Sequence, residues 1–112
     1  MNTLRNSVRL TGHLGANPEV KEVAGGKKIA RFTLATNETY RKQDGEKVTE
    51  TTWHQLYAWG KTAEIAEKYL KKGQEISIEG KLTNRTWEDE NGHKRNITEV
   101  QVNEVMMFGK KD

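Results

Sequence analysis

The centre of the chain reads Thr52-Trp53-His54-Gln55-Leu56-Tyr57-Ala58-Trp59-Gly60-Lys61. Side chains alternate between the two faces of a β-strand, so a strand here would have two unlike faces. The first face carries Trp53, Gln55, Tyr57 and Trp59, and the second carries His54, Leu56 and Ala58. A buried Gln amide would need several hydrogen-bond partners. We therefore expect the aliphatic face to form the core and the aromatic face to stay open, where rings can stack on nucleic-acid bases.

An ordinary aromatic core or protein interface is the alternative for this stretch. Aromatic residues are favoured in any strand and supply much of the apolar area of cores and interfaces. The rest of the sequence is needed to distinguish a base-stacking surface from an aromatic core or protein interface.

Length and composition fit one small domain with a thin core. The chain has 112 residues, of which 33% are hydrophobic and 31% charged, as in a small barrel whose strands each bury one face. The net charge of +3 permits a polyanionic partner without requiring one. The absence of cysteine excludes disulfides and thiolate zinc sites. We expect no signal peptide and no membrane-spanning segment, because apolar runs are short.

A period of two predicts further strands on both sides of the central one. Residues 6–15 and 28–37 form strands, with a short strand at 20–23, and residues 38–50 form a long projecting hairpin. The inward residues of these strands are Val8, Leu10, Leu14, Ala30, Phe32 and Leu34. Gly12 also lies on the inward parity, which suggests a bend. Arg31 points outward, on the open face.

A short helix and two more strands complete the expected order. Thr62 is the expected helix cap and Gly73 the expected end, with Ala63, Ala66, Tyr69 and Leu70 along the buried side. The next strand, residues 76–87, turns Ile76, Ile78 and Leu82 inward and Arg85 and Trp87 outward. Asn91-Gly92 is a hairpin signal, and the last strand, 96–105, turns Val100 and Val102 inward.

Three strands, a helix and two strands is the order of the OB-fold, a five-stranded Greek-key barrel with one short α-helix between strands 3 and 4. The fold class is therefore mainly β. We expect residues 1–108 to form one OB-fold domain and residues 109–112 a short polar C-terminal end.

The residues also resemble bacterial single-stranded DNA-binding protein over about residues 4 to 108. Several blocks match in the right order, which makes the resemblance specific. The blocks are Gly12-His13-Leu14-Gly15-Ala16-Asn17-Pro18-Glu19-Val20, Phe32-Thr33-Leu34-Ala35-Thr36, Trp53-His54, Trp59-Gly60-Lys61-Thr62-Ala63-Glu64, Tyr69-Leu70-Lys71-Lys72-Gly73 and Ile78-Glu79-Gly80-Lys81-Leu82.

The resemblance implies sequence-tolerant binding and protection of single-stranded DNA in replication, repair and recombination, in the bacterial cytoplasm at the nucleoid or at replication forks. By position, the stacking aromatics are Tyr40, Trp53, Trp59 and Trp87. The phosphate-binding cations are Arg41, Lys61, Lys72 and Arg85, to which Arg31 is added by its outward parity. Gln55, Thr83 and Thr86 occupy places where some relatives carry Arg or Lys, so fewer phosphate contacts are expected here.

The resemblance also implies a homotetramer, with Val8, Leu10 and His54 at the expected oligomer interface. The family often continues into a disordered tail whose acidic, apolar tip recruits replication and repair proteins. This chain ends at Asp112. Either the tail was never encoded or the sequence is a trimmed form, so recruitment through a tail is doubtful.

An enzyme is not expected, and neither is a cofactor or a metal. His13, His54 and His93 are far apart in sequence, and none belongs to a metal or nucleophile motif. We interpret Glu88-Asp89-Glu90 as a solvated hairpin loop. The other hypothesis is a primosome-type accessory or scaffold protein of the same fold, resembling primosomal replication protein N, that acts mainly through protein contacts. The four spaced aromatics disfavour it.

Overall fold

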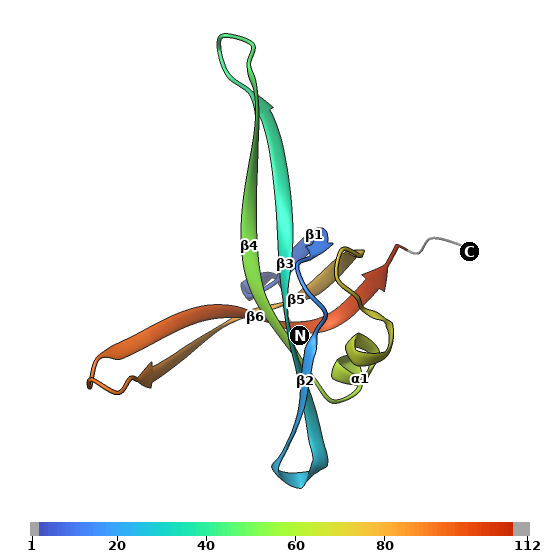
Figure 1. The fold of residues 1–112 in the computed structure, drawn as a ribbon, viewed down its shortest axis with the longest axis vertical. Helices are drawn as coiled ribbons and strands as arrows, with labels where there is room; N and C mark the ends of the chain where they lie inside the picture. Colours follow the sequence, from blue (N-terminus) through green and yellow to red (C-terminus); the bar gives the residue numbers. More distant parts are fainter. Residues whose placement is uncertain (1–2, 109–112) are drawn as a thin grey trace.

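The computed structural model describes residues 3–108 and is mainly β (Figure 1). The predicted polar end, residues 109–112, lies outside the described residues. The β-strands are β1 (Val8–Leu14), β2 (Glu19–Val23), β3 (Lys27–Arg41), β4 (Lys47–Trp59), β5 (Glu75–Glu88) and β6 (Lys94–Met107). One α-helix, α1 (Gly60–Tyr69), and two 3-10 helices, η1 (Thr3–Arg5) and η2 (Ala24–Gly26), complete the described elements.

The strands close into a five-stranded barrel. The sheet order is β1-β5-β6-β4-β3-β2, and a further pairing of β1 with β3 joins its ends. β2 is outside the closed ring, paired with β3 alone. All pairings are antiparallel except the short parallel pairing of β4 with β6. The predicted OB-fold is thereby confirmed, with α1 between the third and fourth strands of the ring.

The core lies inside the barrel and is sealed at one end by α1. Leu34, Leu56 and Ile76 are the largest fully buried side chains. The helix contributes Ala63 and Ala66, both completely buried. Small residues on the inner side of the helix let it approach the barrel closely, which suits a chain with few hydrophobic residues.

Two glycines allow the barrel to close. A Cβ on Gly12 would lie 2.0 Å from the carbonyl oxygen of Ala35, at the point where β1 leaves β5 and meets β3. A Cβ on Gly80 would lie 2.0 Å from the carbonyl oxygen of Gln101, next to a register shift in β5. No other residue fits where two backbones come this close. The bend predicted at Gly12 therefore coincides with the closure of the ring.

The helix boundaries differ from the prediction. α1 begins at Gly60, not after Thr62, and Trp59 occupies the N-cap position without a side-chain hydrogen bond. Gly60 has a φ of 59°, which lets the chain turn directly from β4 into the helix. The helix ends at Tyr69, and Gly73 instead forms a later turn with φ 86°, donating its N–H to the carbonyl oxygen of Leu14 at 2.8 Å.

Two residues predicted to face the core are exposed. Tyr69 is 51% exposed because it is the last residue of α1, where the barrel no longer covers the helix. Leu82 is 49% exposed because it follows the irregularity at Gly80, where β5 starts to leave the barrel.

Two hairpins extend far beyond the barrel (Figure 1). We call them the β3–β4 arm, residues 37–51, and the β5–β6 arm, residues 84–98. Each is a two-stranded ribbon whose faces are both accessible to solvent. Within residues 3–108, no helix is long and apolar enough to cross a membrane.

Candidate nucleic-acid interface

The two faces of β4 separate as the alternation predicts. Leu56 and Ala58 are 2% and 0% exposed, whereas Trp53 on the opposite face is 57% exposed. Tyr57 and Trp59 are half-buried on the same open face. The aliphatic face is thus the core and the aromatic face is open, which confirms the predicted orientation of this strand.

The ring of Trp53 lies against Gly15, which belongs to the connection between β1 and β2. A Cβ on Gly15 would lie 2.5 Å from Cζ3 of the Trp53 ring and 2.9 Å from Oγ1 of Thr33. The N–H of Gly15 donates to the carbonyl oxygen of Thr33 at 3.2 Å, which holds this backbone in place. The absence of a side chain at residue 15 therefore makes the space that the indole ring occupies. In the sequence, Gly15 is recognised only as part of a block that resembles the family, and its contact with Trp53 is not predicted.

Trp59 lies at the junction of the barrel and α1. It pairs with Ile29 of β3, and the ammonium of Lys27 lies 5.3 Å from the centroid of its ring. A cation over an aromatic face is attracted by the ring quadrupole. Lys27 was not among the predicted site residues, because its proximity to Trp59 depends on the pairing of β3 with β4.

The other two predicted aromatics lie on the arms. Tyr40 on the β3–β4 arm is 47% exposed, and Trp87 on the β5–β6 arm is 42% exposed. Tyr40 and its neighbour Arg41 point to opposite faces of the ribbon because side chains alternate along a strand. Tyr40 shares the parity of the core residues of β3 and is exposed because the arm extends beyond the core. The four rings are therefore spread over the barrel and both arms.

The predicted cations fall into three groups. Arg31 of β3 lies on the open face and Arg85 lies at the root of the β5–β6 arm, Arg41 lies near the end of the β3–β4 arm, and Lys61 and Lys72 lie at the two ends of the helix region. All five residues are exposed. The backbone N–H of Lys72 donates to Oδ1 of Asn17 at 2.8 Å, which fixes the turn after α1.

A carboxylate that the sequence analysis missed lies between Arg31 and Arg85. Glu99 of β6 is 5% exposed, and it pairs with Arg31 at 2.9 Å and with Arg85 at 3.4 Å. Arg31 lies 5.6 Å from the ring centroid of Tyr57, whose hydroxyl is 3.0 Å from Oγ1 of Thr83. Glu99 has the parity opposite to that of Val100, so alternation could have placed it on this face.

The tip of the β5–β6 arm is organised by Asp89. Its Oδ1 accepts the backbone N–H groups of His93 at 2.9 Å and of Asn91 at 3.0 Å, and its Oδ2 accepts from Arg95 at 2.9 Å. The hydrogen bond from the His93 backbone, supported by Arg95 and Asn91, lowers the pKa of the Asp89 carboxyl. Among residues 3–108, no group of three or more His, Cys, Asp or Glu side chains could hold a metal ion.

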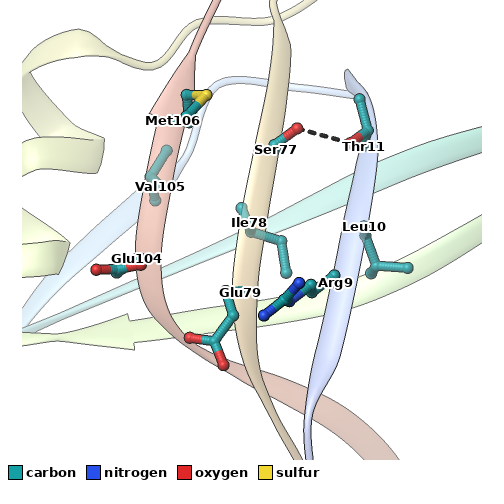
Figure 2. A pocket seen from close by; sticks show the side chains of 9 residues that line it. All are labelled: Arg9, Leu10, Thr11, Ser77, Ile78, Glu79, Glu104, Val105 and Met106. Atoms are coloured by element: carbon teal, nitrogen blue, oxygen red, sulfur yellow. Dashed lines mark hydrogen bonds between the residues drawn. The ribbon is translucent and has the colours of Figure 1, made fainter.

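A second surface lies on the outside of β1, β5 and β6 (Figure 2). It is an open groove of about 550 Å³, lined by apolar residues such as Leu10 and Met106 together with polar and charged ones. Of the predicted interface residues, Leu10 lines this groove, and Val8 lies on the same strand. His54 does not line it and instead lies on β4, where its Nε2 is 3.0 Å from Oγ1 of Thr36.

Residues 5–108 match the single-strand binding protein family. The chain is 44% identical over 108 residues to single-stranded DNA-binding protein 1 of Chlorobaculum tepidum, covering 96% of this chain and 67% of that protein. It is also similar to a Plasmodium falciparum SSB solved in complex with ssDNA, with a TM-score of 0.86 and 31% identity over 93% of this chain and 95% of that one.

Proposed function

Since the chain belongs to the single-strand binding protein family, we propose that it binds single-stranded DNA across the open face of β4 and along both arms. The observation that carries this proposal is the position of Trp53. Its ring is 57% exposed, lies against Gly15, and belongs to the strand face opposite the buried core. An exposed ring held in one place by the fold is what base stacking needs.

Binding of this kind tolerates any base sequence. Every base has a π face, so Tyr40, Trp53, Trp59 and Trp87 can each stack on whichever base reaches them. In a duplex the same faces are stacked on neighbouring bases, so the rings cannot reach them. This difference explains how the surface would select single strands over double strands without reading a sequence.

Phosphate groups would be held by the cations around these rings. Lys61 lies next to Trp59 at the start of α1, Lys72 lies in the turn after α1, and Arg41 lies on the β3–β4 arm near Tyr40. Each phosphate that a cation neutralises releases condensed counterions, so the affinity should fall as salt rises. No catalytic step is assigned to the chain, since stacking and charge pairing are binding interactions only.

Coating of exposed single strands would protect them during replication, repair and recombination. We place this activity in the bacterial cytoplasm, at the nucleoid or at replication forks, where such strands arise. The similarity to a bacterial relative over 96% of the chain supports this location.

We propose that the protein assembles as a homotetramer through the outer surface of β1, β5 and β6. The groove in Figure 2 supports this idea, because it lies on other strands than Trp53 and includes the exposed side chain of Met106 and the half-buried side chain of Leu10. Val8 and Leu10 would be covered there, and His54 would lie at the edge of a subunit contact. Static light scattering should give four times the mass of one chain, and a monomer at micromolar concentration would contradict the assembly.

Fluorescence anisotropy tests the binding function. A labelled oligo(dT) should show saturable binding, and a duplex of the same length should bind far more weakly under the same salt. Equal affinity for the two forms would show that charge alone drives binding and that the rings do not stack on bases.

A further inference from the structure

Glu99 places a negative charge at a position where the proposed function does not require one. Among residues 3–108, Glu99 is the one charged residue that is buried, with 5% of its surface exposed. It lies on the face that we assign to DNA. A carboxylate there repels phosphate groups, and because it is shielded from water its charge is screened less than that of a surface residue. Its presence therefore affects how this face binds a polyanion.

Each carboxylate oxygen of Glu99 contacts one arginine. Oε2 accepts from Nη1 of Arg31 at 2.9 Å, and Oε1 accepts from Nε of Arg85 at 3.4 Å. The two arginines come from β3 and β5, and Glu99 comes from β6, so the contacts link three strands of the barrel. The backbone carbonyl of Glu99 also accepts from Oγ1 of Thr83 at 3.4 Å, which fixes this part of β6.

Both arginines also lie over aromatic rings of the same face. The guanidinium carbon of Arg31 is 5.6 Å from the ring centroid of Tyr57, and that of Arg85 is 4.9 Å from the ring centroid of Trp87. A guanidinium held between a carboxylate and a ring has a fixed orientation. The side chains of Arg31 and Arg85 nevertheless stay 45% and 49% exposed, so each can still reach a ligand.

This inference rests on the proposed function. We propose that Glu99 is a positioning residue that lets the Arg31–Arg85 pair neutralise one DNA phosphate instead of two. The three side chains together carry two positive charges and one negative charge. One phosphate balances the excess, and a second would meet the carboxylate without a free cation. Glu99 thereby holds the guanidinium groups against Tyr57 and Trp87 and makes DNA binding less sensitive to salt than the arginine count suggests.

The substitution Glu99→Gln tests this inference because it keeps the shape of the side chain and removes its charge. For single strands, the logarithm of affinity falls with the logarithm of salt by about 0.7 for each phosphate neutralised. We expect the slope of Glu99→Gln with oligo(dT) to steepen by about this amount, so that its affinity relative to wild type rises about fivefold for each tenfold decrease in salt. A general loosening of the fold would weaken binding without steepening the slope.

The double variant Arg31→Gln/Glu99→Gln is the charge-matched control. It restores the single positive charge of the wild-type cluster, and we expect its salt slope to return to the wild-type value. If Glu99→Gln binds with the wild-type slope, Glu99 does not limit phosphate contacts and the inference is wrong. If wild type itself fails to bind oligo(dT), the proposed function is wrong instead.

Variants that keep Glu99 give an independent measurement if Glu99→Gln does not fold. Arg31→Gln should flatten the salt slope by about 0.7, because it removes the one phosphate contact of the cluster. Adding Arg85→Gln should flatten the slope no further. A second decrease of the same size would show that the two arginines hold two phosphates, which would overturn the inference.

Discussion

The two faces of strand β4 have different roles, although their residues alternate along one short stretch. On the inner face, Leu56 is 2% exposed and belongs to the cluster of buried apolar side chains that forms the core. On the outer face, Trp53 is 57% exposed and its ring lies against Gly15. The inner residue therefore stabilises the fold, whereas the outer residue keeps most of its apolar surface available for a ligand. Substitutions on the two faces should be detected by different measurements.

The largest effect is expected on the inner face. Leu56→Ala should lower the free energy of unfolding by about 2 to 5 kcal/mol, because a fully enclosed side chain leaves a cavity when it is truncated. Urea unfolding measures this change. The variant should still bind oligo(dT) under conditions in which it is folded, and its oligomeric state should be checked because loss of subunits imitates weak binding.

On the outer face, Trp53→Ala should weaken binding of oligo(dT) by about 1 to 3 kcal/mol, the range known for base stacking in single-strand binding proteins. The free energy of unfolding should change far less than in Leu56→Ala, since the ring is exposed. Titration and urea unfolding on the same preparation compare the two. Easy unfolding of Trp53→Ala together with a stable Leu56→Ala would reverse the assignment of the faces.

A smaller effect on binding is expected from Gly15→Ala, which moves the Trp53 ring without removing it. The added methyl would lie 2.5 Å from Cζ3, and the exposed ring can shift away while the backbone stays in place. Affinity for oligo(dT) should fall by less than in Trp53→Ala. Combining both substitutions separates the causes, because Gly15→Ala should have little further effect once the ring is absent.

The smallest effect concerns Asp89 at the tip of the β5–β6 arm, away from both faces of β4. The His93 backbone N–H lowers the pKa of Asp89 below its ordinary value of 3.8, so its carboxylate stabilises the turn above that pH. This contribution is lost as the pH falls through the lower, folded pKa. Carboxyl NMR titration should find Asp89 below 3.8, and a value at or above it would mean that the turn does not hold the charged form.

Local patterns predicted the parts of the fold that depend on local physics. Alternation placed Leu56 and Ala58 inside and Trp53 outside, and Gly12 marked the bend at which the barrel closes. The helix start was wrong because the capping preference of Thr62 is weak compared with the sharp turn that Gly60 permits at φ 59°.

Contacts between distant strands could not be predicted from single residues. The space that the Trp53 ring occupies depends on Gly15, which lies 38 residues earlier in the sequence. Arg31 and Glu99 are separated by 68 positions and meet only because β6 lies beside β4 in the closed barrel. Periodicity gives the face of a residue, but the order of the strands decides which residues of that face become neighbours.

Intrinsic tryptophan fluorescence during titration with oligo(dT) tests most directly whether the open face of β4 stacks on bases. Trp53, Trp59 and Trp87 are the tryptophans of the chain, and all three belong to the proposed binding surface. We expect strong, saturable quenching that is reduced in Trp53→Ala, because a base stacked on an indole ring quenches its emission. Unchanged fluorescence at oligo(dT) concentrations where anisotropy shows full binding would contradict stacking and place the DNA elsewhere on the protein.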